Sequence, residues 1–343
     1  MEKFKKYENN PILKPTGNSW ESLCVLNPAV IFDTKDDEFK MLYRAAGDDK
    51  QHYIYLGLAT SKDGINFKRM LDKPVLAPTL DGADAGCVED PRLIKLQDYY
   101  YLTYASRTFP PGQYWKEDKE YFGFKPEYGP TMLINNNSVT HLAISKDLVS
   151  FKKLGRISDC RYDDRDVIIF FDEVNKRFVR LSRPMEFVGE KYNTKVPSIW
   201  ISYSNDMMEW DNRELLMTPE AWWEDAKIGG SCPPIPCKYG YFFIYHGVSS
   251  KDNAYRVGAV ILDKNNPSKI IARTKDFLME PEYEYETSGY YNGCVFPTGN
   301  VVKDGILYVY YGAADKYICL ATANFDKLVE DLYNEGRLWK GHI

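Results

Sequence analysis

Short runs of apolar and aromatic residues recur along the chain and alternate with polar turns. One repeat unit has a polar or proline-containing start, a β-rich strand, a turn, a second aromatic strand and a third strand such as YLGLATS. Strands rich in Val, Tyr and Phe, joined by such turns, leave little room for helix. The pattern therefore predicts an all-β chain. The five units that can be written out begin at Asn27, Glu89, Arg165, Cys232 and Val295.

The spacing of the units predicts the architecture. The successive intervals are 63, 75, 67 and 64 residues, obtained by subtraction between Pro28, Pro91, Asp166, Pro233 and Pro297. A period of this length with three or four strands per unit is typical of propeller blades. We therefore predict a single five-bladed β-propeller domain over residues 1–343.

The last twenty residues, 324–343, depart from this pattern. Their apolar positions recur at helical spacing, with Phe325, Leu328, Val329 and Leu332 on one face. A short C-terminal helical tail is therefore expected after the last strand.

Charge and composition exclude several classes of protein. The chain has 44 Lys and Arg against 49 Asp and Glu, which leaves no basic patch for a nucleic-acid partner. The N-terminus has no apolar signal region, and no segment approaches the roughly 18 apolar residues of a membrane helix. We expect a soluble, cytoplasmic protein without a membrane partner, and the sequence leaves open whether it forms a homo-oligomer.

Cysteine and histidine spacing gives no sign of a metal or a cofactor. The seven cysteines have no CxxC pair and mostly stand in apolar strands, which predicts buried thiols without disulfides or zinc. The four histidines lack ligand spacing, and the chain has neither GxGxxG nor GxxxxGK[ST]. No metal and no organic cofactor are expected.

Charged residues gather at the strand ends that a propeller brings together. The first strand of each blade starts near the axis, and the antiparallel second strand returns to the same end. Any one of these residues could be a solvated strand end, but their recurrence in all five units predicts a site at one mouth of the channel. They are Asn27, Glu89, Asp90, Arg92, Arg165 and Asp166 at the strand starts, and Arg44, Arg107, Arg183, His246 and Asp315 at the strand ends.

Seven motifs in this region resemble glycoside hydrolase family 130, the family of β-mannoside phosphorylases and related mannosidases. They are EDPR at 89–92, LYRA at 42–45, RDVIIF at 165–170, SRP at 182–184, KIGGSCPPI at 227–235, IYHGV at 244–248 and YYGAAD at 310–315. The resemblance spans residues 7–323. The chain departs from it at Phe171-Asp172, where members commonly have Pro-Glu, and in an insertion at residues 107–138.

The resemblance implies a role for each candidate residue. Asp90 would be the general acid, acting through a substrate hydroxyl. Phosphorolysis needs no second catalytic carboxylate, because phosphate is itself a nucleophile and requires a cationic cradle instead. That cradle would be Arg165, Arg183, Lys227 and His246. The mannosyl unit would be held by Asn27, Arg44 and Asp315, supported by Arg92 and Asp166, although an ion pair between adjacent strands explains the last two equally well.

The expected reaction is the reversible, inverting cleavage of a β-D-mannoside by inorganic phosphate, the co-substrate. Its products are α-D-mannose 1-phosphate and a free sugar. Analogy favours a β-1,4-linked disaccharide or oligosaccharide with glucose, mannose or N-acetylglucosamine as acceptor, and β-1,2 linkages stay open. Two alternatives are a hydrolase, either a mannosidase of this family or an arabinanase-like enzyme, and a non-catalytic sugar-binding propeller. Asn27 speaks against an arabinanase-like enzyme, because an amide cannot serve as the Asp base expected there.

The insertion at 107–138 leaves the second strand of blade two at the mouth end. Its seven aromatic residues argue against disorder. We predict a lid in which Tyr114 or Trp115 stacks on the acceptor sugar. The alternative is a loop that packs on a neighbouring subunit or blade and only stabilises the fold.

Overall fold

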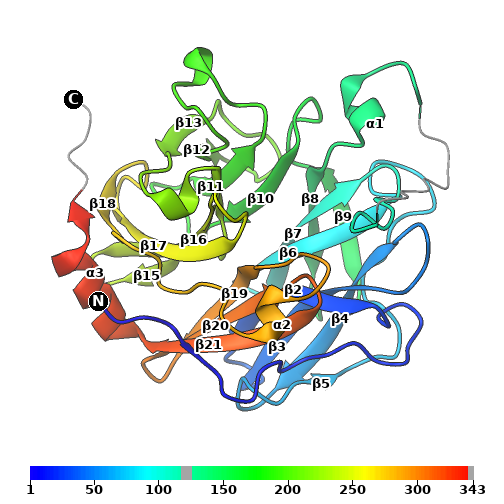
Figure 1. Cartoon of the computed structure of the whole chain (residues 1–343), viewed down its shortest axis with the longest axis horizontal. Coiled ribbons are helices and arrows are strands. Elements are labelled where there is room, and N and C mark those ends of the chain that lie inside the picture. The colour runs from blue at the N-terminus through cyan, green and yellow to red at the C-terminus, as the bar shows by residue number, and fades with distance from the viewer. Residues whose placement is uncertain (117–125, 339–343) are drawn as a thin grey trace.

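The chain is all-β with a few short helices in the computed structural model, which describes residues 1–116 and 126–338 (Figure 1). This confirms the predicted fold class. The strands form five antiparallel groups that follow the predicted repeat. Group one contains β2 (Cys24–Asp33), β3 (Glu38–Ala46), β4 (Ile54–Ser61) and β5 (Lys68–Arg69). Group two contains β6 (Cys87–Leu96), β7 (Tyr99–Arg107), β8 (Val139–Ser145) and β9 (Phe151–Arg156).

The remaining groups have the same antiparallel order. Group three contains β10 (Asp164–Ile169), β11 (Phe178–Pro184), β12 (Ile199–Ser204) and β13 (Glu214–Met217). Group four contains β14 (Lys227–Gly230), β15 (Ile235–Cys237), β16 (Gly240–Val248), β17 (Tyr255–Leu262), β18 (Ile270–Arg273) and β22 (Arg337–Leu338). Group five contains β19 (Val295–Lys303), β20 (Ile306–Ala313), β21 (Tyr317–Asn324) and β1 (Lys5–Lys6). The α-helices are α1 (Thr131–Asn135), α2 (Glu284–Thr287) and α3 (Phe325–Glu335), and the 3₁₀-helices cover Glu190–Tyr192 and Trp222–Glu224.

The first strand of group four differs from its prediction. Instead of one strand across CPPIPC, β14 and β15 pair with the two ends of β16 and leave residues 231–234 between them. Pro233 and Pro234 lie in this gap, and proline has no N–H to donate to a β-ladder. The same split places Lys227 at the end of β16 that carries His246.

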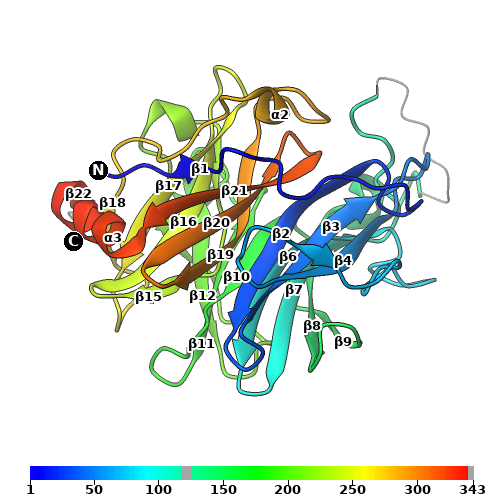
Figure 2. The same cartoon turned by 90° about the horizontal axis from the view of Figure 1, so that it is seen from below.

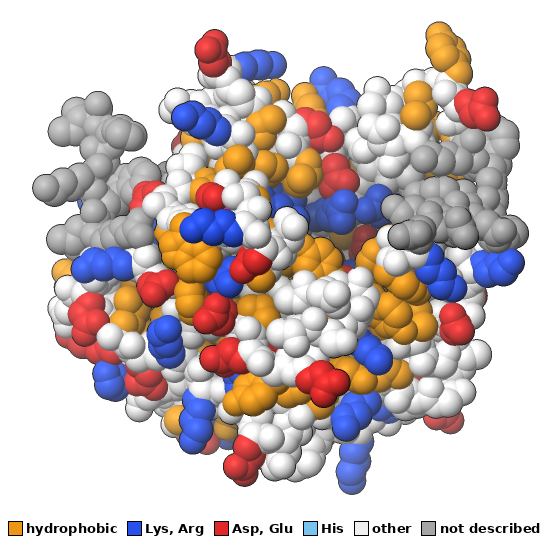
Figure 3. Space-filling model, viewed as in Figure 1, with side chains coloured by type: hydrophobic (Ala, Val, Ile, Leu, Met, Phe, Trp, Pro, Cys, Tyr) orange, Lys and Arg blue, Asp and Glu red, His pale blue; other side chains and the backbone are white. Residues whose placement is uncertain are grey.

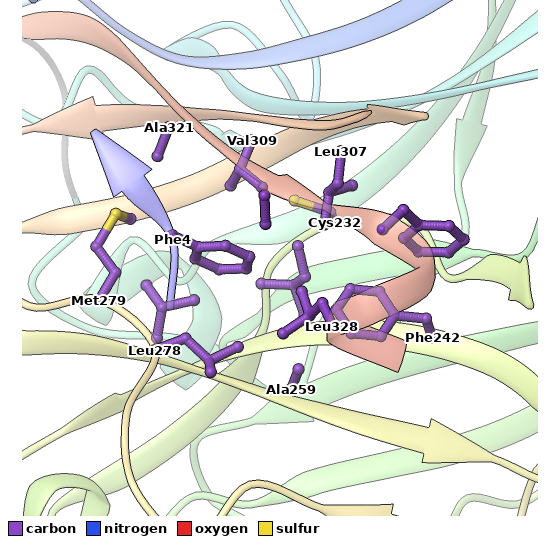
Figure 4. Packing of buried hydrophobic residues seen from close by; sticks show 14 of the residues in the cluster. Phe4, Cys232, Phe242, Ala259, Leu278, Met279, Leu307, Val309, Ala321 and Leu328 are labelled. Carbon is purple, nitrogen blue, oxygen red and sulfur yellow. The ribbon is translucent and has the colours of Figure 1, made fainter. Parts of the chain in front are cut away.

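The N-terminal segment completes group five, which the sequence analysis did not predict. β1 pairs with β21 in the register Lys5↔Thr322, and the segment runs beside the last strands and α3 in Figures 1 and 2. Phe4 is buried in a cluster that includes Leu278 and Met279 (Figure 4). Leu328, from the predicted C-terminal helix, belongs to the same cluster. The helix is confirmed as α3, with all four predicted apolar residues buried.

A β-bulge in the first strand of groups one, two and three positions the polar residues. The pairing shifts at Leu26/Ala29, Glu89/Arg92 and Arg165/Ile168. One residue of each bulge has a left-handed backbone: Asn27 (φ 45), Asp90 (φ 52) and Asp166 (φ 57). Asn and Asp tolerate this region better than other non-glycine residues, and a bulge redirects the side chain that it carries. The polar residues at the starts of these three strands therefore lie in β-bulges.

Backbone pairing among the described residues gives four open sheets, because groups one and two are joined by the single parallel bridge Ile54↔Cys87. The five-bladed propeller thus stays a prediction. Within the described part of the chain, no helix is long and apolar enough to cross a membrane. All seven cysteines are free thiols, and five of them are buried.

Candidate active site

Asp90, in group two, binds side chains of group one. Its Oδ1 accepts hydrogen bonds from Asn27 Nδ2 at 2.7 Å and from Arg44 Nη1 at 2.9 Å. The same Arg44 nitrogen lies 3.0 Å from Glu89 Oε2, and Arg107 Nε lies 3.7 Å from Glu89 Oε1. Within the described residues Asp90 Oδ2 has no hydrogen bond, which leaves one carboxylate oxygen available to a ligand.

The pKa values of the two aspartates beside Arg44 move in opposite directions. Burial opposes ionisation of Asp90, but the charges of Arg44 and Arg92 and the hydrogen bond from Asn27 outweigh it and lower the pKa. Burial raises the pKa of Asp315, and there Arg44 and a hydrogen bond from Tyr114 do not overcome it. Asp90 is therefore the more readily ionised of the two.

A second cluster surrounds Asp166 in group three. Its Oδ2 accepts from Arg183 Nε at 3.1 Å and lies 3.7 Å from His246 Nε2, while its Oδ1 lies 3.5 Å from Arg92 Nη2. Arg92 also donates to the backbone oxygens of Asp90 at 2.8 Å and of Ser231 at 2.6 Å. Arg92 thus connects the two aspartate bulges, as expected for an ion pair between adjacent strands.

Lys227 extends this second cluster with an uncompensated cation. Its ammonium lies 5.1 Å from the centroid of the Tyr255 ring, and among the described residues it has no hydrogen bond or ion pair. Burial, followed by the positive charge of Arg183, lowers the pKa of Lys227 to about 8. Arg165 lies on β10 directly opposite Arg183 and is held by Asp163 at 2.8 Å, with 37% of its side chain exposed. Three cations, Lys227, Arg183 and Arg165, therefore face this part of the site.

His246 does not carry the charge that a cationic cradle would give it. Burial lowers its pKa to about 3, and Arg183 and Lys227 act in the same direction. The imidazole is neutral at neutral pH, and its Nδ1 lies 3.3 Å from Ser231 Oγ. The predicted cationic cradle included His246, and this part of the prediction is wrong: His246 can contribute a hydrogen bond but not a positive charge.

Two motif glycines make room for these side chains. A Cβ at Gly312, in YYGAAD, would stand 2.0 Å from Asn27 Oδ1, and a Cβ at Gly229, in KIGG, would stand 2.6 Å from Asp166 Oδ2. Asn27 Oδ1 and Arg44 Nε are buried without a hydrogen-bond partner in the described structure. Unpaired buried polar atoms are rare in folded proteins and are explained when a bound ligand supplies the missing partner.

The site lies in a confined space. Asp90 and Asp166 line a narrow crevice beside Thr103, Tyr104 and Thr140, in which no water-sized sphere fits. The larger cavities of the described structure are lined by other residues. Lys and Arg side chains, with Asp and Glu among them, gather in a hollow of the face shown in Figure 3.

Comparison with known proteins shows the family of this chain. A family model described as beta-1,4-mannooligosaccharide phosphorylase matches residues 3–334. The chain belongs to glycoside hydrolase family 130. This confirms the resemblance seen in the seven motifs.

Two curated relatives match this chain along nearly their whole length. A 1,2-beta-oligomannan phosphorylase of Thermoanaerobacter sp. (strain X514) is 37% identical over 94% of this chain and 97% of its own. A beta-1,2-mannobiose phosphorylase of the same organism is 33% identical over 96% of this chain and 99% of its own. Among solved structures, beta-1,2-mannobiose phosphorylase from Listeria innocua, in complex with beta-1,2-mannobiose, has a TM-score of 0.77 at 22% identity, covering 96% of this chain and 99% of that one. That likeness shows the fold.

The insertion of this family 130 chain contacts the site directly. Tyr114 Oη donates to Asp315 Oδ2 at 2.8 Å, and Trp115 packs edge-on against His52 with ring centroids 4.9 Å apart. Gly112 N donates to the backbone oxygen of Gln51, so the insertion also packs on group one. Tyr128 is 95% exposed. Stacking of Tyr114 or Trp115 on a sugar stays a prediction, and three further aromatic residues of the insertion, Tyr121, Phe122 and Phe124, lie outside the described residues.

The structure brings the predicted residues of this family 130 chain into two adjoining clusters. The first contains Asn27, Arg44, Asp90 and Asp315, and the second contains Asp166, Arg183, Lys227 and His246, with Arg92 between them and Arg165 at the edge. Sequence reasoning missed three supporting residues, Asp163, Ser231 and Tyr255. Asp163 has a signal in the charged run RYDDRD and Ser231 lies inside the motif KIGGSCPPI, but Tyr255 looks like an ordinary strand residue.

Proposed function

We propose that this family 130 protein is an inverting mannoside phosphorylase that converts a β-D-mannoside and inorganic phosphate into α-D-mannose 1-phosphate and a free sugar. The observation that carries the proposal is the uncompensated cation Lys227 beside Arg183 and Arg165. A partly buried cation without an ion-pair partner of its own is costly, and a phosphate dianion would supply the missing charge. The proposal needs no metal or organic cofactor, because phosphate itself is the nucleophile.

Asp90 acts as the proton donor in this proposal. Its Oδ1 is occupied by Asn27 and Arg44, so Oδ2 is the atom that carries the proton. The arginines keep free Asp90 ionised, which suits the synthetic direction, where the same group must accept a proton. In phosphorolysis, a phosphate dianion in the neighbouring cluster offsets part of the arginine charge and favours protonation of Asp90.

The five-bladed propeller is part of the proposal. It is supported by contacts between the first strands of successive groups: β2 with β6, β6 with β10, β10 with β14, and β19 with β2. Group four contacts group five through β16 and β19. A ring of this kind accounts for the meeting of polar strand starts from groups one to three.

The linkage that we propose is β-1,2. Analogy from the motifs favoured β-1,4, but the relatives at 37% and 33% identity are both named for 1,2-linked mannosides. β-1,4 is the second candidate, because the family model's own description names it. Incubation with α-mannose 1-phosphate and mannose, followed by NMR of the product, should show a β-1,2 glycosidic bond. A β-1,4 product would overturn the linkage and leave the reaction class intact.

Phosphate dependence tests the reaction class. Mannose release from β-1,2- and β-1,4-mannobiose should require inorganic phosphate and should yield α-mannose 1-phosphate. Release at the full rate in phosphate-free buffer would instead identify a hydrolase. Absence of turnover on both disaccharides, and of synthesis from α-mannose 1-phosphate, would favour a sugar-binding protein.

The pH dependence of kcat/KM for phosphate should follow the protonation state of Lys227. Because the free enzyme's Lys227 has a pKa of about 8, it loses its proton and its charge as the pH rises past that value. We expect kcat/KM for phosphate to fall above pH 8, since this parameter follows the free enzyme's ionisations. Lys227→Arg should move that decline to higher pH, because a guanidinium stays protonated. An unchanged decline in Lys227→Arg would assign it to another group.

Tyr114 should support mannoside binding through Asp315. Tyr114→Phe removes the hydroxyl that donates to Asp315 Oδ2, and a typical hydrogen bond contributes about 0.5–1.5 kcal/mol. We expect the KM for the mannoside to rise by up to about tenfold while the KM for phosphate stays constant. Tyr128→Phe, at an exposed tyrosine of the same insertion, is the matched control. A lower melting temperature with unchanged KM values would mean that the insertion only stabilises the fold.

A further inference from the structure

A second cavity, outside the candidate active site, is lined by four arginines. It has a volume of about 510 Å³ and lies between the second and third groups of strands. Its walls are the end of β9 with the segment that follows, β11, and the loop before β13. The arginines are Arg156, Arg161, Arg180 and Arg213.

Arg180 is buried in this cavity without a carboxylate partner. It is 2% exposed, and its guanidinium lies 4.4 Å from the centroid of the Trp210 ring. Nε donates to Ser202 Oγ at 3.1 Å and Nη1 donates to the Ile157 carbonyl oxygen at 2.6 Å, and both acceptors are neutral. No ion pair to Arg180 occurs in residues 1–116 and 126–338. Its orientation is therefore fixed, and the only carboxylate charge that acts on it among the described residues is that of Asp164, which is already paired with Arg213.

Most of the carboxylates that line the cavity form ion pairs with cations other than Arg180. Asp159 binds Arg161 through both oxygens, and Asp211 lies 2.8 Å from Arg177 Nη1. Arg213 is paired with the buried Asp164. The carboxylate of the exposed Glu209 is the exception, because no ion pair holds it in the described structure.

Arg156, like Arg180, has no carboxylate partner in the part of the chain that the structure describes, and it is exposed at the rim. Two arginines against one exposed glutamate leave the cavity with an excess of positive charge. Burial and the neighbouring Arg213 lower the pKa of Arg180 to about 9, because together they outweigh the opposing charge of Asp164. At neutral pH Arg180 is still protonated, so the charge is present.

We propose that this cavity binds a tetrahedral oxyanion, the phosphate group either of inorganic phosphate or of a sugar phosphate. Guanidinium groups match the geometry of phosphate oxygens, and a guanidinium fixed over an aromatic ring loses little freedom on binding. Arg180 supplies the buried charge and Arg156 supplies a second charge at the rim. Arg161 and Arg213 flank the ligand while retaining Asp159 and Asp164.

The cavity and the candidate active site share a wall. Asp163 and Asp164 are consecutive, and their carboxylates bind Arg165 of the active site and Arg213 of the cavity. The two sites are nevertheless built from different arginines, so substitutions can separate them. The proposal does not rest on the phosphorylase reaction.

Isothermal titration of the full-length protein with inorganic phosphate tests the proposal. Wild-type protein should show two binding events. Arg156→Ser combined with Arg161→Ser, both at exposed positions, should weaken one event about tenfold or more and leave the other unchanged. Arg180→Met should remove the same event. Lys152→Ser, which removes an exposed lysine from the same strand as Arg156, should bind as wild-type does.

Comparison with Lys227→Ala separates this site from the active site. An event that survives Lys227→Ala and is lost in the rim double variant supports the second site, even if phosphate does not bind at the mouth. A single wild-type event that Lys227→Ala abolishes and the rim variant retains would overturn it. Titration with α-mannose 1-phosphate assigns the source: tighter binding than phosphate at the rim-dependent site indicates a sugar phosphate, and equal or weaker binding indicates inorganic phosphate.

Discussion

Asp90→Asn is expected to fold normally and to lose phosphorolysis by about two to four powers of ten in kcat/KM, the range for removal of a general acid. An asparagine in its place can still accept hydrogen bonds through Oδ1 from Asn27 and Arg44. What it loses is the oxygen that would carry the proton. The loss should therefore be catalytic, with little change in melting temperature.

Initial rates of α-mannose 1-phosphate formation at saturating phosphate provide the measurement. Asp315→Asn is the matched control, because it neutralises the neighbouring buried aspartate. It should raise the KM for the mannoside, with a smaller effect on kcat than Asp90→Asn. Near-normal turnover by Asp90→Asn would place the acid elsewhere, with Glu89, 3.0 Å from the same Arg44 nitrogen, as the next residue to test.

Lys227→Ala should raise the KM for phosphate about ten- to a hundredfold, because it removes one charge-assisted contact worth roughly 1.5–3 kcal/mol. The KM for the mannoside should change much less. Lys227 suits this test because in the described residues its ammonium holds no partner that would be left unpaired. Steady-state kinetics with each substrate varied in turn will separate the two constants.

Arg183 needs a different substitution. Arg183→Ala would leave the buried Asp166 without its closest cation, and breaking a buried ion pair costs about 3–5 kcal/mol of stability. Arg183→Lys keeps the positive charge and removes the bidentate geometry of the guanidinium, so it should raise the KM for phosphate in a folded protein.

Lys251→Ala is the matched control for Lys227→Ala, because that exposed lysine lies over Trp222 outside the cluster. Equal losses for both substrates would place Lys227 in the sugar pocket or the scaffold.

The sequence by itself predicted the all-β class, the five strand groups and α3, because each depends on local patterns. Alternating apolar residues, turn residues and helical spacing act over a few positions and can be counted. The motifs also indicated the polar residues of the site, since EDPR and RDVIIF place charges where a strand should be apolar.

Only the tertiary structure decided how these charges are used. The bulges at Asn27, Asp90 and Asp166 turn the three side chains, although Asn-Pro and Asp-Pro at the first two positions hint at them. The neutral state of His246 follows from its burial beside Arg183 and Lys227, which come from other strands. The contact between Tyr114 and Asp315 joins residues 201 positions apart. Burial and charge pairing are sums over neighbours distant in sequence, and no local pattern of residues contains them.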